Sequence, residues 1–312
     1  MNTRSVKIKI RSFLWKVLGS HDVTNEVKNL KEQVKTLQFF LNSFHDIQNV
    51  PPTADKDLRL LQLCDAQLLF IIDKLCKKKH LTYWLDAGTL LGAYRHNGVI
   101  PWDDDIDIAM PRNDYNRIIE VIHSELPNTG IHAELKEGRI GIGYNHLETG
   151  IWIDVYPIDD YYTNDNFEIE YNKYNSIINR YKSYVIKKDK AFSSDELALI
   201  IQKDLWTKTS DVNSAYQYLY YCPRVFNSPI NFYKYEDVYP LTELMFEGRL
   251  LPTPSHVENY LALCLSKNFM FFPETGVLHH GRGRKPLSEW AKNHHIDMHQ
   301  VHDLLENLYE KC

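Results

Sequence analysis

Cysteine is scarce in this chain, and its spacing argues against two common kinds of site. The five cysteines are odd in number, lie far apart and form no Cys-x-x-Cys pair. Zinc sites and disulfide frameworks normally use paired or closely spaced cysteines. We therefore expect neither kind here, and the pattern favours a reducing compartment.

Long apolar runs and an excess of positive charge are also missing. No stretch reaches the roughly 18 apolar residues of a membrane-spanning helix, and the N-terminus lacks the apolar core and cleavage site of a secretory signal. The formal net charge of −5 gives no sign of general nucleic-acid binding. We expect a cytoplasmic protein, with peripheral contact at the inner face of the cell membrane as a further expectation.

Acidic residues, in contrast, are concentrated at one place. Within five residues stand four aspartates: Asp103, Asp104, Asp105 and Asp107. Two carboxylates about 4 Å apart repel by roughly 4 kcal/mol at an effective dielectric constant of about 20, so such a group needs either solvent or a cation. Apolar residues at 106, 108 and 110 alternate with Asp105 and Asp107, which is the pattern of a half-buried strand. Both carboxylates then lie on one face, where they could share Mg²⁺.

A glycine and a hydroxyl residue precede the acidic stretch. Gly88 allows backbone amides to approach an anion closely, and Thr89 could begin a helix whose free N–H groups point at a phosphate. A turn of this kind followed by Asp-x-Asp is typical of metal-assisted phosphoryl or nucleotidyl transfer. The alternative is a solvated acidic loop beside a glycine turn.

The two motifs together resemble the LicD family. The resemblance lies in Tyr83–Gly98 and Ile100–Asp107, is dense from about residue 60 to 160, and continues weakly in Phe246–Pro254. The family includes phosphocholine transferases of bacterial surface glycans and is related to fukutin-type ribitol-phosphate transferases. Further on it usually shows a Tyr-Gly pair, where this chain has Leu265–Asn268, which leaves the acceptor side open.

The resemblance implies an α+β fold of the nucleotidyltransferase type, with a mixed sheet and flanking helices. It also implies an enzyme that transfers a phosphorus-containing group from a CDP-linked alcohol with Mg²⁺, Mn²⁺ being the alternative ion. A glycan, either free or linked to lipid, is the expected acceptor.

These expectations assign roles to particular residues. We predict that Asp105 and Asp107 hold the metal ion. Asp154 is the third candidate, because the resemblance implies an acidic residue on a neighbouring strand that binds metal or accepts the proton of the acceptor hydroxyl. The alternative for Asp154 is a buried and paired structural aspartate.

The donor is expected to contact a second group of residues. We predict that the backbone at Gly88 and the hydroxyl of Thr89 hold a donor phosphate, and that Arg95 or His96 adds positive charge there. Trp102 could stack on a base or line the pocket, and a place in the core is equally compatible with its position.

The first fifty residues differ in pattern from the rest. Residues 1–20 carry five basic and no acidic residues, and their apolar residues recur at helical spacing. This indicates a basic amphipathic helix on an anionic membrane, or else a frayed basic tail. In residues 21–50 the apolar positions follow a heptad seam, which predicts a coiled coil and self-association. The alternative is a single helix packed on the main domain. Pro51 and Pro52 mark a linker.

The remaining chain divides into three parts. We predict a catalytic core at residues 55–165, with helices at 55–80 and 112–124, a short strand at 83–85 and a hairpin formed by 139–144 and 151–156. Residues 166–240 are expected to be mostly helical. Residues 241–312 are expected to be a helical C-terminal part of the catalytic domain.

Three functions compete. The leading hypothesis is transfer of a phospho-alcohol, phosphocholine or a similar group, to a cell-surface glycan. The second is transfer of the nucleoside monophosphate itself to a small molecule or protein. The third is an inactive, membrane-tethered coiled-coil scaffold, against which the presence of all the candidate site residues argues.

Overall fold

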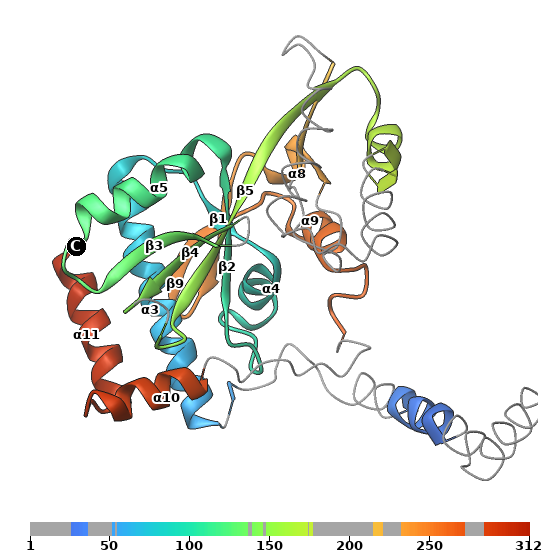
Figure 1. Cartoon of the computed structure of the whole chain (residues 1–312). Helices are drawn as coiled ribbons and strands as arrows, with labels where there is room; N and C mark the ends of the chain where they lie inside the picture. Colours follow the sequence, from blue (N-terminus) through green and yellow to red (C-terminus); the bar gives the residue numbers. More distant parts are fainter. Residues whose placement is uncertain are drawn as a thin grey trace, which may run out of the picture. The chain divides into compact units, whose positions relative to one another are not determined.

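The structure of the 312-residue chain is a computed structural model that describes residues 26–36, 52–53, 55–136, 139–145, 148–173, 175–176, 215–220, 232–271 and 284–312 (Figure 1). The chain divides into two units, one formed by Met1–Asn49 with Phe271–Gly276 and the other by Val50–Met270 with Val277–Cys312. All predicted site residues belong to the second unit.

The first unit contributes one described helix, residues 26–36. Its apolar residues Val27, Leu30 and Val34 are exposed at 45%, 55% and 44%. This part of the predicted heptad face is therefore helical and exposed, and the structure does not show a coiled coil. The rest of the predicted seam and the basic segment 1–20 lie outside the described residues. In the described part of the chain, no helix has the length and apolar character needed to cross a bilayer.

The second unit is built on a mixed sheet. Its central path runs in the order β1-β2-β5-β4-β3, and only the β2–β5 pair is parallel. The strands are β1 (Trp84–Leu85), β2 (Ile106–Pro111), β3 (Ile131–Lys136), β4 (Arg139–Tyr144) and β5 (Trp152–Thr163). The predicted hairpin of β4 and β5 is confirmed. The fold is a mixed sheet with flanking helices, as predicted.

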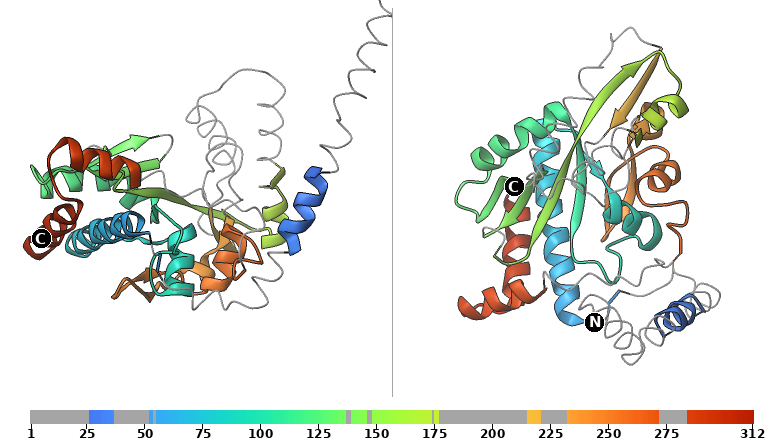
Figure 2. Two further views of the ribbon diagram at one scale, coloured as in Figure 1. Left: turned by 90° about the horizontal axis from the view of Figure 1, so that it is seen from below. Right: turned by 45° about the vertical axis from the view of Figure 1, so that its right-hand side comes forward.

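Helices cover this sheet because each has an apolar side. The longest, α3 (Lys56–Lys79), is capped by the Asp55 carboxylate, which accepts from two backbone amides, and it lies against β2 and β5. The last helix, α11 (Met298–Lys311), packs along α3, as Figure 2 shows from two sides. The other helices around the sheet are α4 (Ala87–His96), α5 (Arg112–Glu125), α9 (Val257–Cys264) and α10 (Arg284–Asn293).

The helical expectation for residues 166–240 is wrong for much of its described part. A helix covers 167–173, but β6 (Tyr216–Tyr220) and β7 (Phe232–Lys234) follow, with only the short α8 (Tyr235–Val238) after them. β6 pairs with the end of β5, and its tyrosines alternate along the strand, where aromatic residues pack well. Residues 177–214 lie outside the described residues.

The helical expectation for residues 241–312 is wrong at its start. β8 (Thr242–Phe246) and β9 (Arg249–Thr253) form a two-stranded hairpin before the helices begin. Glu247 and Gly248 form its turn, with φ of +46° and +83°. Two residues with positive φ suit a tight hairpin turn, because their twist matches that of the strands.

Candidate active site

The parallel pair of strands brings two of the predicted aspartates together. Asp107 on β2 lies directly opposite Asp154 on β5 in the strand register, at the usual strand spacing of about 4.8 Å. Asp105 precedes β2 by one residue and lies two positions before Asp107, on the same side of the chain. In the part of the chain that the structure describes, these three carboxylates do not form a set with oxygen atoms all within 4.8 Å of one another.

Negative charge accumulates around Asp107. Burial raises its pKa well above the ordinary value, and the charges of Asp105 and Asp154 raise it further, followed by those of Asp86 and Asp103. Burial and the neighbouring carboxylates both make a negative charge on Asp107 unfavourable. The group therefore has the electrostatics of a site that favours a cation.

Asp65 on α3 is a further carboxylate of this group, and the sequence analysis missed it. Its side chain is buried, and its carboxylate accepts a hydrogen bond of 3.1 Å from the amide of Trp152, two residues before Asp154. Burial raises its pKa well above the ordinary value, and Asp105 raises it further. The available signal was a charged residue on the apolar face of a helix, where charge is rarely tolerated unless it has a partner.

Asp154 has a positively charged partner. The Nε atom of Arg139, at the start of β4, forms an ion pair with the Asp154 carboxylate. The two side chains are only 11% and 9% exposed. Asp154 is thus buried and paired, as the alternative of a structural aspartate requires. It also lies beside Asp107, as the predicted metal site requires. Arg139 was not recognised from the sequence, because an arginine at a strand end carries no local signal.

The Gly-Thr element forms the start of α4, as predicted, but the helix begins earlier. Asp86 is its N-cap and accepts from the Ala87 amide at 2.8 Å, and Ala87 has φ of +43°. A Cβ atom added to Gly88 would lie 2.9 Å from Oδ2 of Asp103. Glycine therefore allows the Asp103 carboxylate to approach here, and a larger residue would displace that carboxylate.

The hydroxyl of Thr89 has a structural contact. Its Oγ1 accepts a hydrogen bond of 2.8 Å from the backbone amide of Asp107. This bond joins the first turn of α4 to β2 beside the carboxylates. The hydroxyl proton remains able to donate, since a hydroxyl both accepts and donates.

Asp86 also belongs to a buried network behind the site. Its carboxylate accepts from the hydroxyl of Tyr260 at 2.8 Å, and the same hydroxyl accepts from the indole N–H of Trp84 at 3.1 Å. Burial raises the pKa of Asp86, and the hydrogen bonds from Tyr260 and Ala87 oppose this. The network fixes the position at which α4 begins.

The loop between α4 and β2 is held from both sides. Gln62 of α3 is buried, and its amide donates to the carbonyl groups of Ile100 at 3.2 Å and Asp103 at 2.8 Å. Glu247, in the β8–β9 turn, accepts from the Val99 amide at 3.0 Å. It also accepts two hydrogen bonds, of 2.9 and 2.6 Å, from the Arg59 guanidinium. The aspartates are thus presented by a fixed loop.

Arg95, His96 and Trp102 form a cluster beside this loop. The Nε atom of Arg95 donates to Nε2 of His96 at 2.9 Å, and its guanidinium lies 5.7 Å from the Trp102 ring centre. Burial and the neighbouring Arg95 lower the pKa of His96 to about 4. His96 is therefore neutral near pH 7, which favours Arg95 as the residue of the predicted pair that adds positive charge. Burial lowers the pKa of Arg95 to about 10, so Arg95 keeps its charge.

Comparison with known proteins agrees with this arrangement. Residues 80–256, more than half of the chain, match the model of the LicD/FKTN/FKRP nucleotidyltransferase domain.

The chain belongs to the LicD/FKTN/FKRP family.

Named relatives match over shorter stretches. The lipopolysaccharide cholinephosphotransferase LicD of Haemophilus influenzae is 46% identical over 68 residues, which is 22% of this chain and 26% of that protein. Human ribitol 5-phosphate transferase FKRP is 31% identical over 94 residues, 27% of this chain and 19% of that protein. Mouse ribitol-5-phosphate transferase FKTN is 28% identical over 106 residues, 34% and 21% of the two chains. The matches thus span about a quarter or less of these relatives.

The family match confirms the resemblance seen in the sequence. The matched range contains Asp105, Asp107 and Asp154, and it also contains Arg139 and Glu247. Asp65 and Gln62 precede it, although both contact the group that it contains. The LicD/FKTN/FKRP domain in this chain is therefore completed by α3.

Proposed function

We propose that this chain transfers a phospho-alcohol from a CDP-alcohol to a hydroxyl group of a cell-surface glycan. Phosphocholine is the first choice of group, followed by ribitol phosphate, as the names of the relatives indicate. The observation that carries the proposal is the register of the parallel strands, in which Asp107 lies opposite Asp154, with Asp105 two positions earlier. These carboxylates lie beside the start of α4, whose backbone N–H groups give a phosphate a place to bind.

These carboxylates are the kind of ligand that Mg²⁺ prefers, and the side chains would have to move for all three to hold one ion. Mg²⁺ prefers carboxylate oxygens and is usually held by one or two of them together with substrate phosphates. The carboxylates around Asp107 raise its pKa, so their mutual repulsion favours a cation at this place. We infer that Asp105 and Asp107, with Asp154, hold the ion, Mn²⁺ being the alternative. When bound, the ion neutralises charge that develops on the transferred phosphoryl group.

The chain's own residues bind and orient the donor. The first turn of α4 offers backbone N–H groups at Gly88 and Thr89 to a phosphate, with the helix dipole favouring negative charge. Arg95 supplies positive charge near Asp103. Trp102 packs beside Arg95 and would line the place where the donor binds. These groups lower the free energy of the charged donor without changing protonation.

The residue Arg139 has a second role in this proposal. It pairs with Asp154 and balances its charge. Its guanidinium is a bidentate donor that suits a phosphate of the donor. Asp154 would hold a divalent cation in competition with Arg139, or accept the proton of the acceptor hydroxyl.

A donor screen tests the proposal. The purified chain is incubated with CDP-choline, CDP-ribitol, CDP-glycerol and CDP-ethanolamine, with a glycan acceptor, with and without Mg²⁺. We expect CMP and an acceptor heavier by one phospho-alcohol. An acceptor heavier by a nucleotide would establish the second hypothesis, nucleotidyl transfer. No product under any condition would support the inactive scaffold instead.

Self-association and membrane contact are part of the proposal for the N-terminal region. The exposed Val27, Leu30 and Val34 of helix 26–36 support pairing with a second copy through this face. Binding of residues 1–20 to anionic lipid rests on their sequence alone. Co-sedimentation with vesicles that contain an anionic lipid, compared with neutral vesicles, measures the latter.

A further inference from the structure

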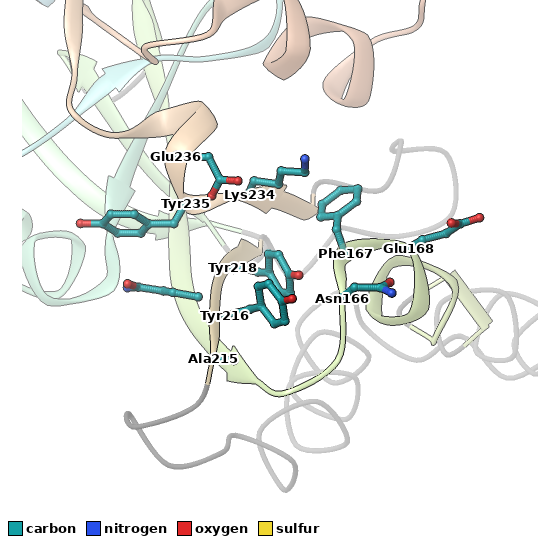
Figure 3. Close-up of a pocket in the computed structure, with 10 residues that line it drawn as sticks. Asn166, Phe167, Glu168, Ala215, Tyr216, Tyr218, Lys234, Tyr235 and Glu236 are labelled. Carbon is teal, nitrogen blue, oxygen red and sulfur yellow. The ribbon is translucent and has the colours of Figure 1, made fainter.

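A cavity lies at the far end of β5 from Asp154. It has a volume of about 590 Å³, within the range of small-molecule sites. β6, the end of β7 and the start of helix 167–173 form its walls, and Figure 3 shows Tyr216 and Tyr218 next to each other with Phe167 on one side. Nothing in the proposed transfer chemistry uses these residues.

Two stacked tyrosines line this cavity. Tyr216 and Tyr218 lie on the same face of β6, since they are two residues apart. Their rings are stacked, with centres 6.1 Å apart and planes at 6°. Tyr218 is buried, and Phe167 meets its ring edge-on at 5.6 Å, but Tyr216 is 45% exposed. A large aromatic ring in contact with water gains free energy when a ligand covers it.

The walls of the cavity are fixed before any ligand binds. The buried Glu170 accepts hydrogen bonds of 3.0 Å from the hydroxyls of Tyr161 and Thr163, which anchors helix 167–173 to the end of β5. The amide of Gln217 donates to Asp160 at 2.9 Å. A surface that is already ordered loses little side-chain entropy on binding.

The charges of the cavity select the class of ligand. The ammonium group of Lys234 lies 5.6 Å from the Phe167 ring centre, so a cation already occupies that aromatic face and opposes a second one. The carboxylates of Glu168 and Glu236 line the same cavity and oppose a phosphate or a nucleotide. A neutral ring with one apolar face and several hydroxyl groups fits both constraints, because it can stack on Tyr216 and bond to these polar groups.

We propose that this cavity is a saccharide-binding subsite, which holds a neutral sugar of the acceptor glycan away from the reacting hydroxyl. The inference rests on the proposed transfer to a glycan. Tyr161, the register partner of Tyr218, is seven residues beyond Asp154 on β5, which corresponds to about 23 Å of strand. The subsite therefore serves acceptors with several sugars, and a short acceptor cannot occupy both places.

Packed side chains connect the subsite with the carboxylates. Tyr235, at the rim, contacts Tyr239 with ring centres 4.8 Å apart, and Tyr239 meets Trp84 edge-on at 5.9 Å. Trp84 in turn bonds to Tyr260 in the network around Asp86. The two places thus belong to one packed body, and an acceptor held at one is positioned relative to the other.

A binding experiment with matched variants tests this inference. The probes are neutral hexose and N-acetylhexosamine oligosaccharides, uronic-acid oligosaccharides, choline and CMP, titrated calorimetrically into the full chain. We expect neutral oligosaccharides to bind, Tyr216→Ala to weaken binding about tenfold, and Tyr216→Phe to retain it. Leu304→Ala, which truncates an exposed residue on α11, is the control and should leave binding unchanged. Thermal melting confirms that each variant is folded.

Donor hydrolysis separates this inference from the proposed function. Release of CMP from a CDP-alcohol in the absence of acceptor should be the same in Tyr216→Ala and the unmodified chain, while the KM for a long acceptor rises. Saccharide binding in a protein that never releases CMP would refute the proposed function and not the subsite. The subsite is refuted by the absence of saccharide binding at millimolar concentration, by a loss of choline or CMP binding in Tyr216→Ala, or by equal effects of Tyr216→Ala and Leu304→Ala on saccharide binding.

Discussion

Arg139→Gln removes the cation that pairs with Asp154. Both side chains are about nine-tenths buried, so the carboxylate loses this partner in a place where water replaces it poorly. Breaking a buried ion pair from one side typically costs about 3–5 kcal/mol. For a folded unit of this size each 1 kcal/mol shifts the melting temperature by about 2–4 °C. We therefore expect a fall of roughly 6–20 °C, measured by calorimetry in buffer with EDTA.

The second part of this prediction concerns metal. If a divalent cation competes with Arg139 for Asp154, Mn²⁺ should recover much of the lost stability in Arg139→Gln. Arg112→Gln is the matched control, because Arg112 makes a two-bond pair with Asp159 on the same strand, at 2.8 and 2.6 Å. That variant should also be destabilised, but Mn²⁺ should add no more stability than it adds to the unmodified chain.

The reasoning can be refuted in two ways. A loss of less than about 1 kcal/mol in Arg139→Gln would mean that the pair contributes no more than an exposed one. Equal recovery of both variants by Mn²⁺ would mean that the ion binds elsewhere. The second outcome would remove Asp154 from the metal site.

Three further perturbations test other parts of the structure. Asp107→Asn should abolish turnover yet raise the melting temperature without metal. The pKa of Asp107 is higher in the folded than in the unfolded chain, so the unmodified chain loses stability as the pH rises above about 4. The difference in melting temperature between the variant and the unmodified chain should therefore grow from about pH 4 to about pH 7. Gly92→Ala places a Cβ atom 2.4 Å from the backbone oxygen of Gly98 and should lower the free energy of unfolding in urea by about 3 kcal/mol. Gly248→Ala, with φ of +83° and nothing within 4 Å of the added Cβ atom, should lower it by about 1 kcal/mol. Deleting residues 1–50 should leave a folded unit and abolish self-association, as measured by light scattering.

Each has an outcome that contradicts it. Full activity of Asp107→Asn would show that the acidic pair is not catalytic, and a pH-independent difference in melting would show that Asp107 is not crowded by charge. Similar costs for the two alanine variants would mean that the contact of α4 with the following loop is loose. A truncated chain that still self-associates would place the contact outside the heptad segment.

The sequence predicted the central elements because their patterns are local. The apolar periodicity of 55–80 and 112–124 and the alternation around Asp107 are set by neighbours a few residues away, and α3, α5 and β2 follow them. The pairing of Asp107 with Asp154 was also expected, since the family resemblance implied an acidic residue on a neighbouring strand.

The remaining features depend on contacts between distant residues. Asp65 and Arg139 join the carboxylates only because α3 and β4 lie beside β5. The strands β6 and β7 depend on the length of β5 beyond the central sheet, and a tyrosine-rich segment alone does not reveal that partner. The neutral state of His96 depends on burial beside Arg95, which no spacing in the sequence reports.

The contacts of Glu247 carry a consequence for the order of folding. The loop before the aspartates is held by this residue through the Val99 amide and through the bond from its own amide to the Asn97 carbonyl, at 2.9 Å. Glu247 lies 148 positions after Val99 in the sequence. During synthesis the aspartates leave the ribosome long before the hairpin that holds their loop, so the site cannot be completed until that hairpin has emerged and docked. A nascent chain therefore carries the acidic motif for much of its synthesis without a fixed place to hold a donor.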